Sequence, residues 1–227
     1  MTVPLYETPI PDVPTLPSRA SGPVEEIHAQ VLCLFAMVSE GLAAATAAFL
    51  AGDREAARRL VAEDRLIDEL QSSTEELVQT ELSRPNRSDG ELRLFVSVLR
   101  IVPELERSGD LVEHIALRTQ LGLVGDLTPL TRGLIGEMGS IGVRMWRGAA
   151  EAWAARDAAA THQLRLLDDE LDDLHVQLTA ELGQSTTSIP AAIELGLVAR
   201  FFERLGDHAV NVAGRIGYLV SDPVGRT

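Results

Sequence analysis

Two related stretches indicate the fold of this chain: FFERLGDHAVNVAGR (residues 201–215) and its counterpart LERSGDLVEHIALR (residues 105–118). Each stretch places a glycine inside a helical pattern, where glycine costs roughly 1 kcal/mol relative to alanine. Each also places two acids four residues apart, where like charges on one helix face repel each other. The recurrence predicts an internal repeat. The matching positions are Glu106 with Glu203, Gly109 with Gly206, and Asp110 with Asp207.

A second pair of segments repeats in the same order. The segment AGDREAARRLVAEDRLIDEL (51–70) aligns with ARDAAATHQLRLLDDELDDL (155–174). This alignment places Asp64 over Asp168 and Asp68 over Asp172. Two tandem three-helix units are therefore predicted, the first over 24–121 and the second over 127–220.

Apolar residues recur with helical spacing through most of the chain, and no stretch alternates as a strand would. The fold class is therefore predicted to be all-α. More than half of the eleven prolines lie in residues 1–23, which predicts an extended arm there, and 221–227 is a short tail. Suitable N-cap residues are Asp53, Ser88, Asp157 and Ser188. The six predicted helices span 24–50, 53–83, 89–121, 127–154, 157–183 and 188–220.

The charge balance and the single cysteine limit the partners and the compartment. The net charge of −14 and the absence of a basic stripe disfavour a nucleic-acid partner. One cysteine, Cys33, forms no internal disulfide and suits a reducing compartment. The chain shows neither a secretory signal nor a run of about 18 uninterrupted apolar residues. A cytoplasmic protein without a membrane span is expected.

The repeated acids lie beside the apolar stripes of their helices. On a helical wheel they fall about 80° to 120° from the stripe centre, which is neither the core nor the far polar face. If the second and third helices of each unit pack together, four carboxylates converge on one surface patch of that unit. These carboxylates account for more than half of the net charge. The candidate metal ligands are Asp64, Asp68, Glu106, Asp110, Asp168, Asp172, Glu203 and Asp207.

Two interpretations of these acids stay open. Clustered carboxylates repel unless they are protonated, paired or bound to cations, and hard oxygen ligands favour Fe, Mn, Mg or Ca, with Zn also a candidate. Alternatively, the acids form a solvated face neutralised in part by Arg107 and Arg204, which adjoin them. Gly109 and Gly206 fall near the stripe centre, so we expect them to permit close approach of two helices rather than to contact a ligand.

Catalytic sites find little support in the sequence. A di-metal carboxylate enzyme of the four-helix type requires Glu-x-x-His motifs on two helices. Only Glu25 with His28 fits that spacing. No nucleophile motif, phosphate-binding loop or dinucleotide-binding glycine pattern occurs. We therefore expect a protein that is not an enzyme.

With these residues in view, the chain resembles the PhoU family, the accessory regulators of bacterial phosphate-specific transport. The resemblance is carried by FFERLGDHAVNVAGR, LERSGDLVEHIALR, EDRLIDEL and DDELDDLH, and it spans about residues 24 to 220. It implies two three-helix bundles related by pseudo-twofold symmetry, a homodimer, and multinuclear metal binding in some members. It also implies negative regulation of the Pst transporter and of Pho regulon signalling, through the cytoplasmic ATPase subunit and the sensor histidine kinase. Membrane association would be peripheral only.

The first unit departs from this pattern. Ser108, Glu113 and His114 make its motif a weaker copy, and Pro103 lies one turn before Glu106, where it removes a backbone donor and is expected to kink the helix. The second unit is therefore the better metal candidate. The alternative function is a carboxylate-rich metal-buffering protein, with a carboxylate-bridged metalloenzyme as a more distant third.

Overall fold

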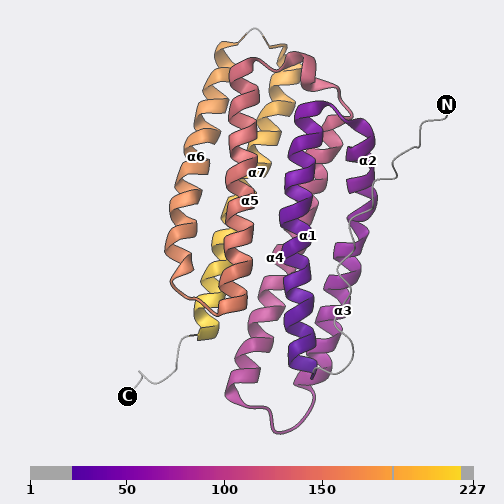
Figure 1. Cartoon of the computed structure of the whole chain (residues 1–227), viewed down its shortest axis with the longest axis vertical. Coiled ribbons are helices and arrows are strands. Elements are labelled where there is room, and N and C mark those ends of the chain that lie inside the picture. The colour runs from indigo at the N-terminus through magenta and orange to yellow at the C-terminus, as the bar shows by residue number, and fades with distance from the viewer. Residues whose placement is uncertain (1–21, 186, 221–227) are drawn as a thin grey trace, which may run out of the picture.

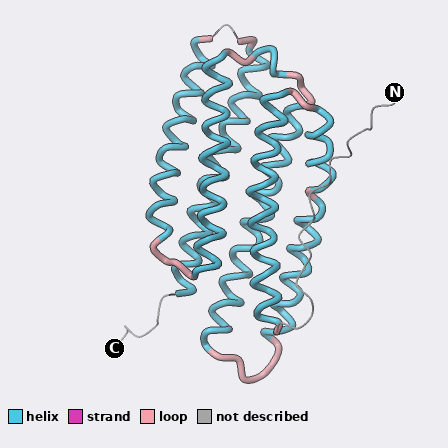
Figure 2. The backbone as a smooth tube through the Cα atoms, in the orientation of Figure 1, coloured by secondary structure: helices cyan, strands magenta, loops and turns pink. Residues whose placement is uncertain are grey.

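The computed structural model describes residues 22–185 and 187–220, and within these ranges all regular structure is helical (Figures 1 and 2). The predicted all-α class is confirmed. Of the predicted proline-rich arm and tail, residues 1–21 and 221–227 lie outside the described residues. The elements are α1 (Pro23–Ala51), α2 (Arg54–Glu63), α3 (Arg65–Leu82), α4 (Asp89–Thr119), a 3₁₀ turn η1 (Leu123–Asp126), α5 (Pro129–Ala155), α6 (Ala160–Gln184) and α7 (Ile189–Val220).

Most of the predicted caps begin helices. The Asp53 carboxylate accepts hydrogen bonds from the backbone N–H groups of Glu55 and Ala56, which satisfies donors that the first turn of α2 leaves free. Ser88 forms a reciprocal capping box with Glu91 at the start of α4. Asp157 is the exception, because α6 begins three residues later at Ala160. The Asp157 side chain instead accepts from the N–H of Ala159 within the preceding turn.

The helix predicted over 53–83 is divided in two at Asp64. The backbone dihedrals of Asp64 stay helical (φ −55°, ψ −38°), but its carbonyl accepts from the N–H of Ile67, three residues on, which tightens the turn. The corresponding helix of the second unit, α6, is continuous. Helix α4 also continues through Pro103. The two units therefore differ at Asp64, where the helix that packs against α4 is divided, as well as at Pro103 of α4.

Four helices form the centre of the molecule: α1 packs against α5, α4 packs against α7, and each pair joins the two units. Phe35 lies against Trp146 and His28 against Trp153, so α1 and α5 run antiparallel. Both pairs are antiparallel, as a twofold axis perpendicular to the helices requires. Helices α2 and α3 flank this centre on one side and α6 flanks it on the other (Figure 1).

One face of helix α1 is buried in the core of the bundle. The helix is long and apolar enough to cross a membrane by length and composition alone, with a mean hydropathy of 1.8 over its most apolar window. A core helix of a helical bundle passes the same test. Leu34, Val38 and Leu42 of α1 are fully buried among the other helices. Burial in the protein core therefore accounts for the large apolar side chains on this face of α1.

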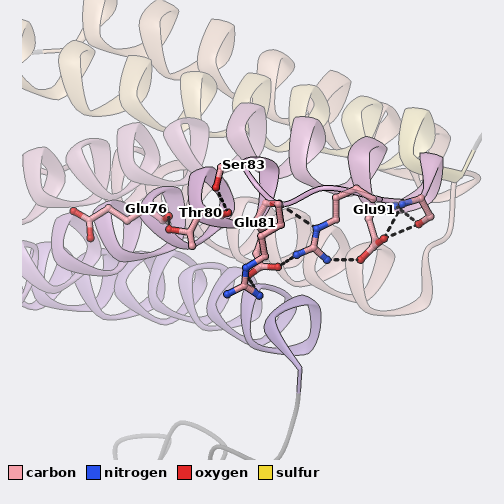
Figure 3. A network of polar contacts seen from close by, with 8 residues as sticks. Glu76, Thr80, Glu81, Ser83 and Glu91 are labelled. Atoms are coloured by element: carbon pink, nitrogen blue, oxygen red, sulfur yellow. Dashed lines mark hydrogen bonds and ion pairs between the residues drawn. The ribbon is translucent and has the colours of Figure 1, made fainter.

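A polar network fixes the connection between α3 and α4 (Figure 3). Glu81, whose side chain is only 1 % exposed, forms ion pairs with Arg84 and Arg87. Arg87 also pairs with Glu91 of α4 at 2.8 Å and lies over the ring of Phe95. A buried carboxylate requires such partners because an unpaired charge is costly away from water. The network holds the start of α4 in place beside the end of α3.

Candidate metal centre

The two glycines of the repeated motifs lie where a neighbouring helix approaches closely. A Cβ atom placed on Gly206 of α7 would lie 2.5 Å from Oδ1 of Asp168 on α6. A Cβ on Gly109 of α4 would lie 2.7 Å from Cδ1 of Ile67 on α3 and 3.4 Å from Oδ1 of Asp64, which directly precedes α3. The predicted role in close helix approach is confirmed. The absent side chains also make room for a carboxylate of the neighbouring helix.

This packing brings the predicted acids together in two groups, one on each flank of the molecule. We call Asp64, Asp68, Glu106 and Asp110 the first acid cluster, which lies between α3 and α4. We call Asp168, Asp172, Glu203 and Asp207 the second acid cluster, which lies between α6 and α7. All eight side chains are exposed or half-buried, as expected for positions beside the apolar stripe.

The deepest acid of the first cluster is Asp64. The pKa of Asp64 is raised to about 6, first by burial and then by nearby negative charges, with Glu113 ahead of the other cluster members. Burial also raises the pKa of Glu106, with Asp110 and Asp68 adding to the shift. The pKa values of Asp64 and Glu106 are therefore both raised by charges on the facing helix, so the cluster extends across the α3–α4 contact.

The second cluster repeats this electrostatic pattern. Burial raises the pKa of Asp168 to about 6, with Asp172 and Asp207 as the next causes. The pKa values of Asp172 and Glu203 are also raised, in each case first by burial. The two clusters thus share one arrangement, in which an aspartate against the glycine is the most perturbed acid.

Three further charged residues belong to these surroundings and were not among the predicted ligands. Glu113, three residues after Asp110, extends the first cluster, so its presence adds a carboxylate rather than only weakening the motif. His175, three residues after Asp172, lies near the second cluster. Spacing of i, i+3 on one helix face was the signal for both. Glu203 pairs with Arg200, and not with the adjacent Arg204, which was the predicted source of neutralisation.

The donor chemistry of the second cluster fits a hard cation. Its carboxylates repel one another, and Oε2 of Glu203 is buried without a hydrogen-bond partner, so a cation would relieve both conditions. In the described part of the chain, however, no group of three or more His, Cys, Asp or Glu side chains is already arranged to hold a metal ion. The carboxylates lie within electrostatic reach without forming a coordination sphere.

One other polar group has the composition of a catalytic triad. Ser108 of α4 lies 3.0 Å from Nδ1 of His208 on α7, and Nε2 of His208 faces the Glu104 carboxylate at 3.9 Å. The Ser108 hydroxyl donates to the Glu104 carbonyl at 2.6 Å, so the imidazole N–H donates to the serine rather than activating it. Ser108 is fully buried. The group is a structural contact between the two units.

The Glu-x-x-His pair of the first helix also lies away from the acid clusters. His28 stacks on Trp153 of α5, with ring centroids 5.1 Å apart. Burial lowers the pKa of His28, and Arg156 lowers it further. The geometry thus gives no support to a di-iron enzyme site built on this pair.

The fold and the two clusters define a class of protein: a helical bundle of two repeats, each with paired carboxylates on its second and third helical segments. The PhoU domain family matches the chain twice, over residues 31–119 and 135–216, one match within each predicted unit. The chain belongs to the PhoU family.

Individual relatives agree with this assignment. The chain is 31 % identical over 175 residues to the phosphate-specific transport system accessory protein PhoU homolog 2 of Mycobacterium tuberculosis, covering 76 % of this chain and 82 % of that protein. It is 28 % identical over 211 residues to a PhoU homolog of Burkholderia, covering 90 % of each chain. The crystal structure of PhoU from Pseudomonas aeruginosa superimposes with a TM-score of 0.81 at 25 % identity, over 87 % of this chain and 97 % of that one.

Proposed function

We propose that this chain regulates phosphate homeostasis, restraining uptake by the phosphate-specific ABC transporter and signalling phosphate sufficiency to a sensor histidine kinase. The observation that carries the proposal is the double PhoU domain match, together with relatives whose names place them in the phosphate-specific transport system. We propose that it acts as a cytoplasmic homodimer, touching the membrane only through its partners. Its contact with the transporter would run through the cytoplasmic ATPase subunit.

The proposed action is binding rather than catalysis. Ser108 of the triad-like group is fully buried, and the strongly perturbed acids Asp64 and Asp168 are half-buried beside helix–helix contacts. A regulator of this kind acts by binding one state of its partner more tightly than another, which shifts the partner's conformational equilibrium. No bond in a substrate needs to change for this to occur.

We also propose that cations bind at the two acid clusters. In the second cluster Asp168, Asp172, Glu203 and Asp207 would supply oxygen ligands, and Fe, Zn, Mn, Mg and Ca are the candidate ions. A bound cation would neutralise carboxylates that now repel across the α6–α7 contact. The residues of the first cluster would act in the same way between α3 and α4.

The regulatory role is tested by deleting the gene and measuring alkaline phosphatase expression in phosphate-rich medium. We expect expression to rise, because the signal of phosphate sufficiency is lost, and to fall again when the wild-type gene is restored. Unchanged expression in a strain with no second copy of the gene would contradict the proposal.

A metal-buffering role is the second candidate, favoured by the concentration of perturbed carboxylates in the two clusters. Elemental analysis of protein purified without chelator tests cation binding. The double variant Glu203→Ala/Asp207→Ala should lose metal while keeping its helical circular dichroism spectrum. The matched control is Glu170→Ala/Asp173→Ala, on exposed positions of the same flank. Metal-free wild-type protein would remove the buffering role and leave the regulatory role standing.

A further inference from the structure

One arginine lies among the carboxylates of the second acid cluster. Arg200, which precedes Glu203 by about one turn of α7, forms an ion pair with Oε1 of the Glu203 carboxylate. The Glu203 side chain is only 13 % exposed, whereas Arg200 is 52 % exposed. Oε2 of the same carboxylate is buried without a hydrogen-bond partner. One oxygen of Glu203 is therefore held by a positive charge that belongs to the chain itself, and the other is left unpaired.

The charge of Arg200 acts on both helices of the cluster. Burial raises the pKa of Glu203 on α7, and Arg200 is the largest influence that lowers it. Burial also raises the pKa of Asp172 on α6, and Arg200 is again among the charges that lower it. The guanidinium therefore offsets part of the repulsion between carboxylates that a bound cation would otherwise relieve.

The first acid cluster has no equivalent arginine. In the repeat alignment, Pro103 of α4 takes the position of Arg200. Arg107, which directly follows Glu106, pairs instead with Glu104 at 3.1 Å. Glu106 forms no ion pair among the residues that the structure describes. The two clusters have repeat-related carboxylates but differ in one built-in positive charge.

A cation and the Arg200 guanidinium cannot share Glu203 without a cost. Two positive charges close to one carboxylate repel each other, so each weakens the binding of the other. Arg200 must leave Oε1 before Glu203 can offer both of its oxygens to a cation. An ion pair with one partner half in solvent is weak. Arg200 therefore lowers the cation affinity of the cluster without closing it.

We propose that Arg200 is an internal competitor for the cation of the second acid cluster: it holds Glu203 in the cation-free protein and is displaced when a cation binds. The proposal rests on the proposed function, under which cations bind at the two acid clusters. Arg200 thereby sets the affinity of the second cluster, whereas the first cluster binds without a competitor. Displacement also leaves an exposed guanidinium unpaired beside the cluster, so the cation-bound and cation-free forms differ in surface charge.

The test is a titration of chelator-stripped, full-length protein with Mn²⁺, in which electron paramagnetic resonance measures the free ion. Binding at the second cluster is identified as the component that Glu203→Ala/Asp207→Ala removes. We expect Arg200→Gln to tighten this component by about fivefold, the factor that corresponds to loss of a weak ion pair. Arg200→Lys keeps the positive charge and should stay within about twofold of wild type.

The matched control is Arg204→Gln. Arg204 directly follows Glu203, is exposed, and forms no ion pair with any other described residue. The control removes the same charge from the same helix, so a general electrostatic effect would appear in it equally. At an ionic strength of about 0.15 M, which screens exposed charges beyond about 8 Å, we expect it to change the affinity by less than about twofold. Both arginines are exposed, so the variants should fold, which circular dichroism checks.

The outcomes separate the competitor from the site. If Arg200→Gln leaves the second-cluster component unchanged or weakens it, Arg200 does not compete and the proposal is refuted, while the cation site stands. Equal gains in Arg200→Gln and Arg204→Gln would also refute it, because net charge alone would then set the affinity. If no Mn²⁺ binding depends on Glu203 and Asp207, in wild type or in Arg200→Gln, the cation site fails together with the competitor, and the proposed regulatory role is not affected.

Discussion

At the scale of single residues, Gly206 shows why a locally unfavourable choice persists in a helix. Its backbone is ordinary α-helix, so glycine is not needed there for its torsion angles. The space that a methyl group would fill is instead taken by Asp168 and Leu171 of α6. The cost of glycine in a helix is therefore offset by close packing of α6 against α7 and by the position that packing gives to Asp168.

We predict that Gly206→Ala lowers the free energy of unfolding by about 1–3 kcal/mol, because overpacking outweighs the gain in helix propensity. Gly196→Ala, on the same helix but with nothing within 4 Å of the new methyl group, should raise it by up to about 1 kcal/mol. Chemical denaturation of both variants measures the contrast. Equal effects of the two substitutions would refute the packing role of Gly206.

Asp168 supplies a prediction that depends on pH. Its pKa is about 6 in the folded protein against 3.8 as the ordinary value, so between these pH values the folded state holds more protons than the unfolded state. The free energy of unfolding therefore falls as pH rises from about 4 to about 6, and the penalty is complete above that range. In metal-free protein, Asp168→Asn should thus be more stable than wild type at pH 7.5.

The difference in stability between Asp168→Asn and wild type should shrink towards zero at pH 4. Thermal unfolding at both pH values, in the presence of a chelator, measures it. The control variant is Asp173→Asn, whose side chain is exposed on the same helix. A stability difference that is the same at pH 4 and pH 7.5 would show that the Asp168 carboxylate is not destabilised in the folded protein by burial and its negative neighbours.

At the scale of elements, the joint between α3 and α4 depends on one buried charge. Removing Arg87 leaves Glu81 with Arg84 alone, at a position almost closed to water. We predict that Arg87→Ala lowers the free energy of unfolding by about 3 kcal/mol, the usual cost of breaking a buried ion pair. Urea denaturation measures this loss.

The exposed pair Arg59–Glu55 gives the comparison for Arg87. Both side chains are largely in solvent, at 62 % and 76 % exposed. Arg59→Ala should therefore change the free energy of unfolding by less than about 1 kcal/mol. A similar small change for Arg87→Ala would mean that the α3–α4 network is dispensable for stability.

At the scale of the whole molecule, the two repeats share one interior. The α1–α5 and α4–α7 contacts join the units through buried side chains, among them Trp146 and Trp153. Ser108 and His208 add a buried polar contact between the same units. The sequence therefore consists of two repeats, but these repeats share one hydrophobic core that extends across both.

We predict a single cooperative unfolding transition for the metal-free protein. Tryptophan fluorescence reports on α5, where both tryptophans lie against α1, and far-UV circular dichroism reports on all helices. The two signals should share one midpoint in urea, because separating the repeats exposes the common core. Two distinct midpoints would indicate that the repeats unfold independently.

The helices themselves were predictable because their causes are local. The spacing of the apolar residues predicted six helical segments, and in the structure helices begin directly after Asp53 and Ser88, as predicted. The division at Asp64 was not predictable, since no proline or glycine precedes it and the break shows only in the backbone hydrogen bonding. The start of α6 was misplaced because Asp157 can cap a short turn as readily as a helix.

The acid clusters were only half determined by the sequence. Repeat-related spacing placed each pair of acids on one helix face, because the α-helical period is a local property of the chain. Which helices face each other, how deeply Asp64 and Asp168 are buried, and that Arg200 pairs with Glu203 were decided by tertiary packing. Contacts between residues distant in sequence depend on the whole arrangement of the core, which no local pattern encodes.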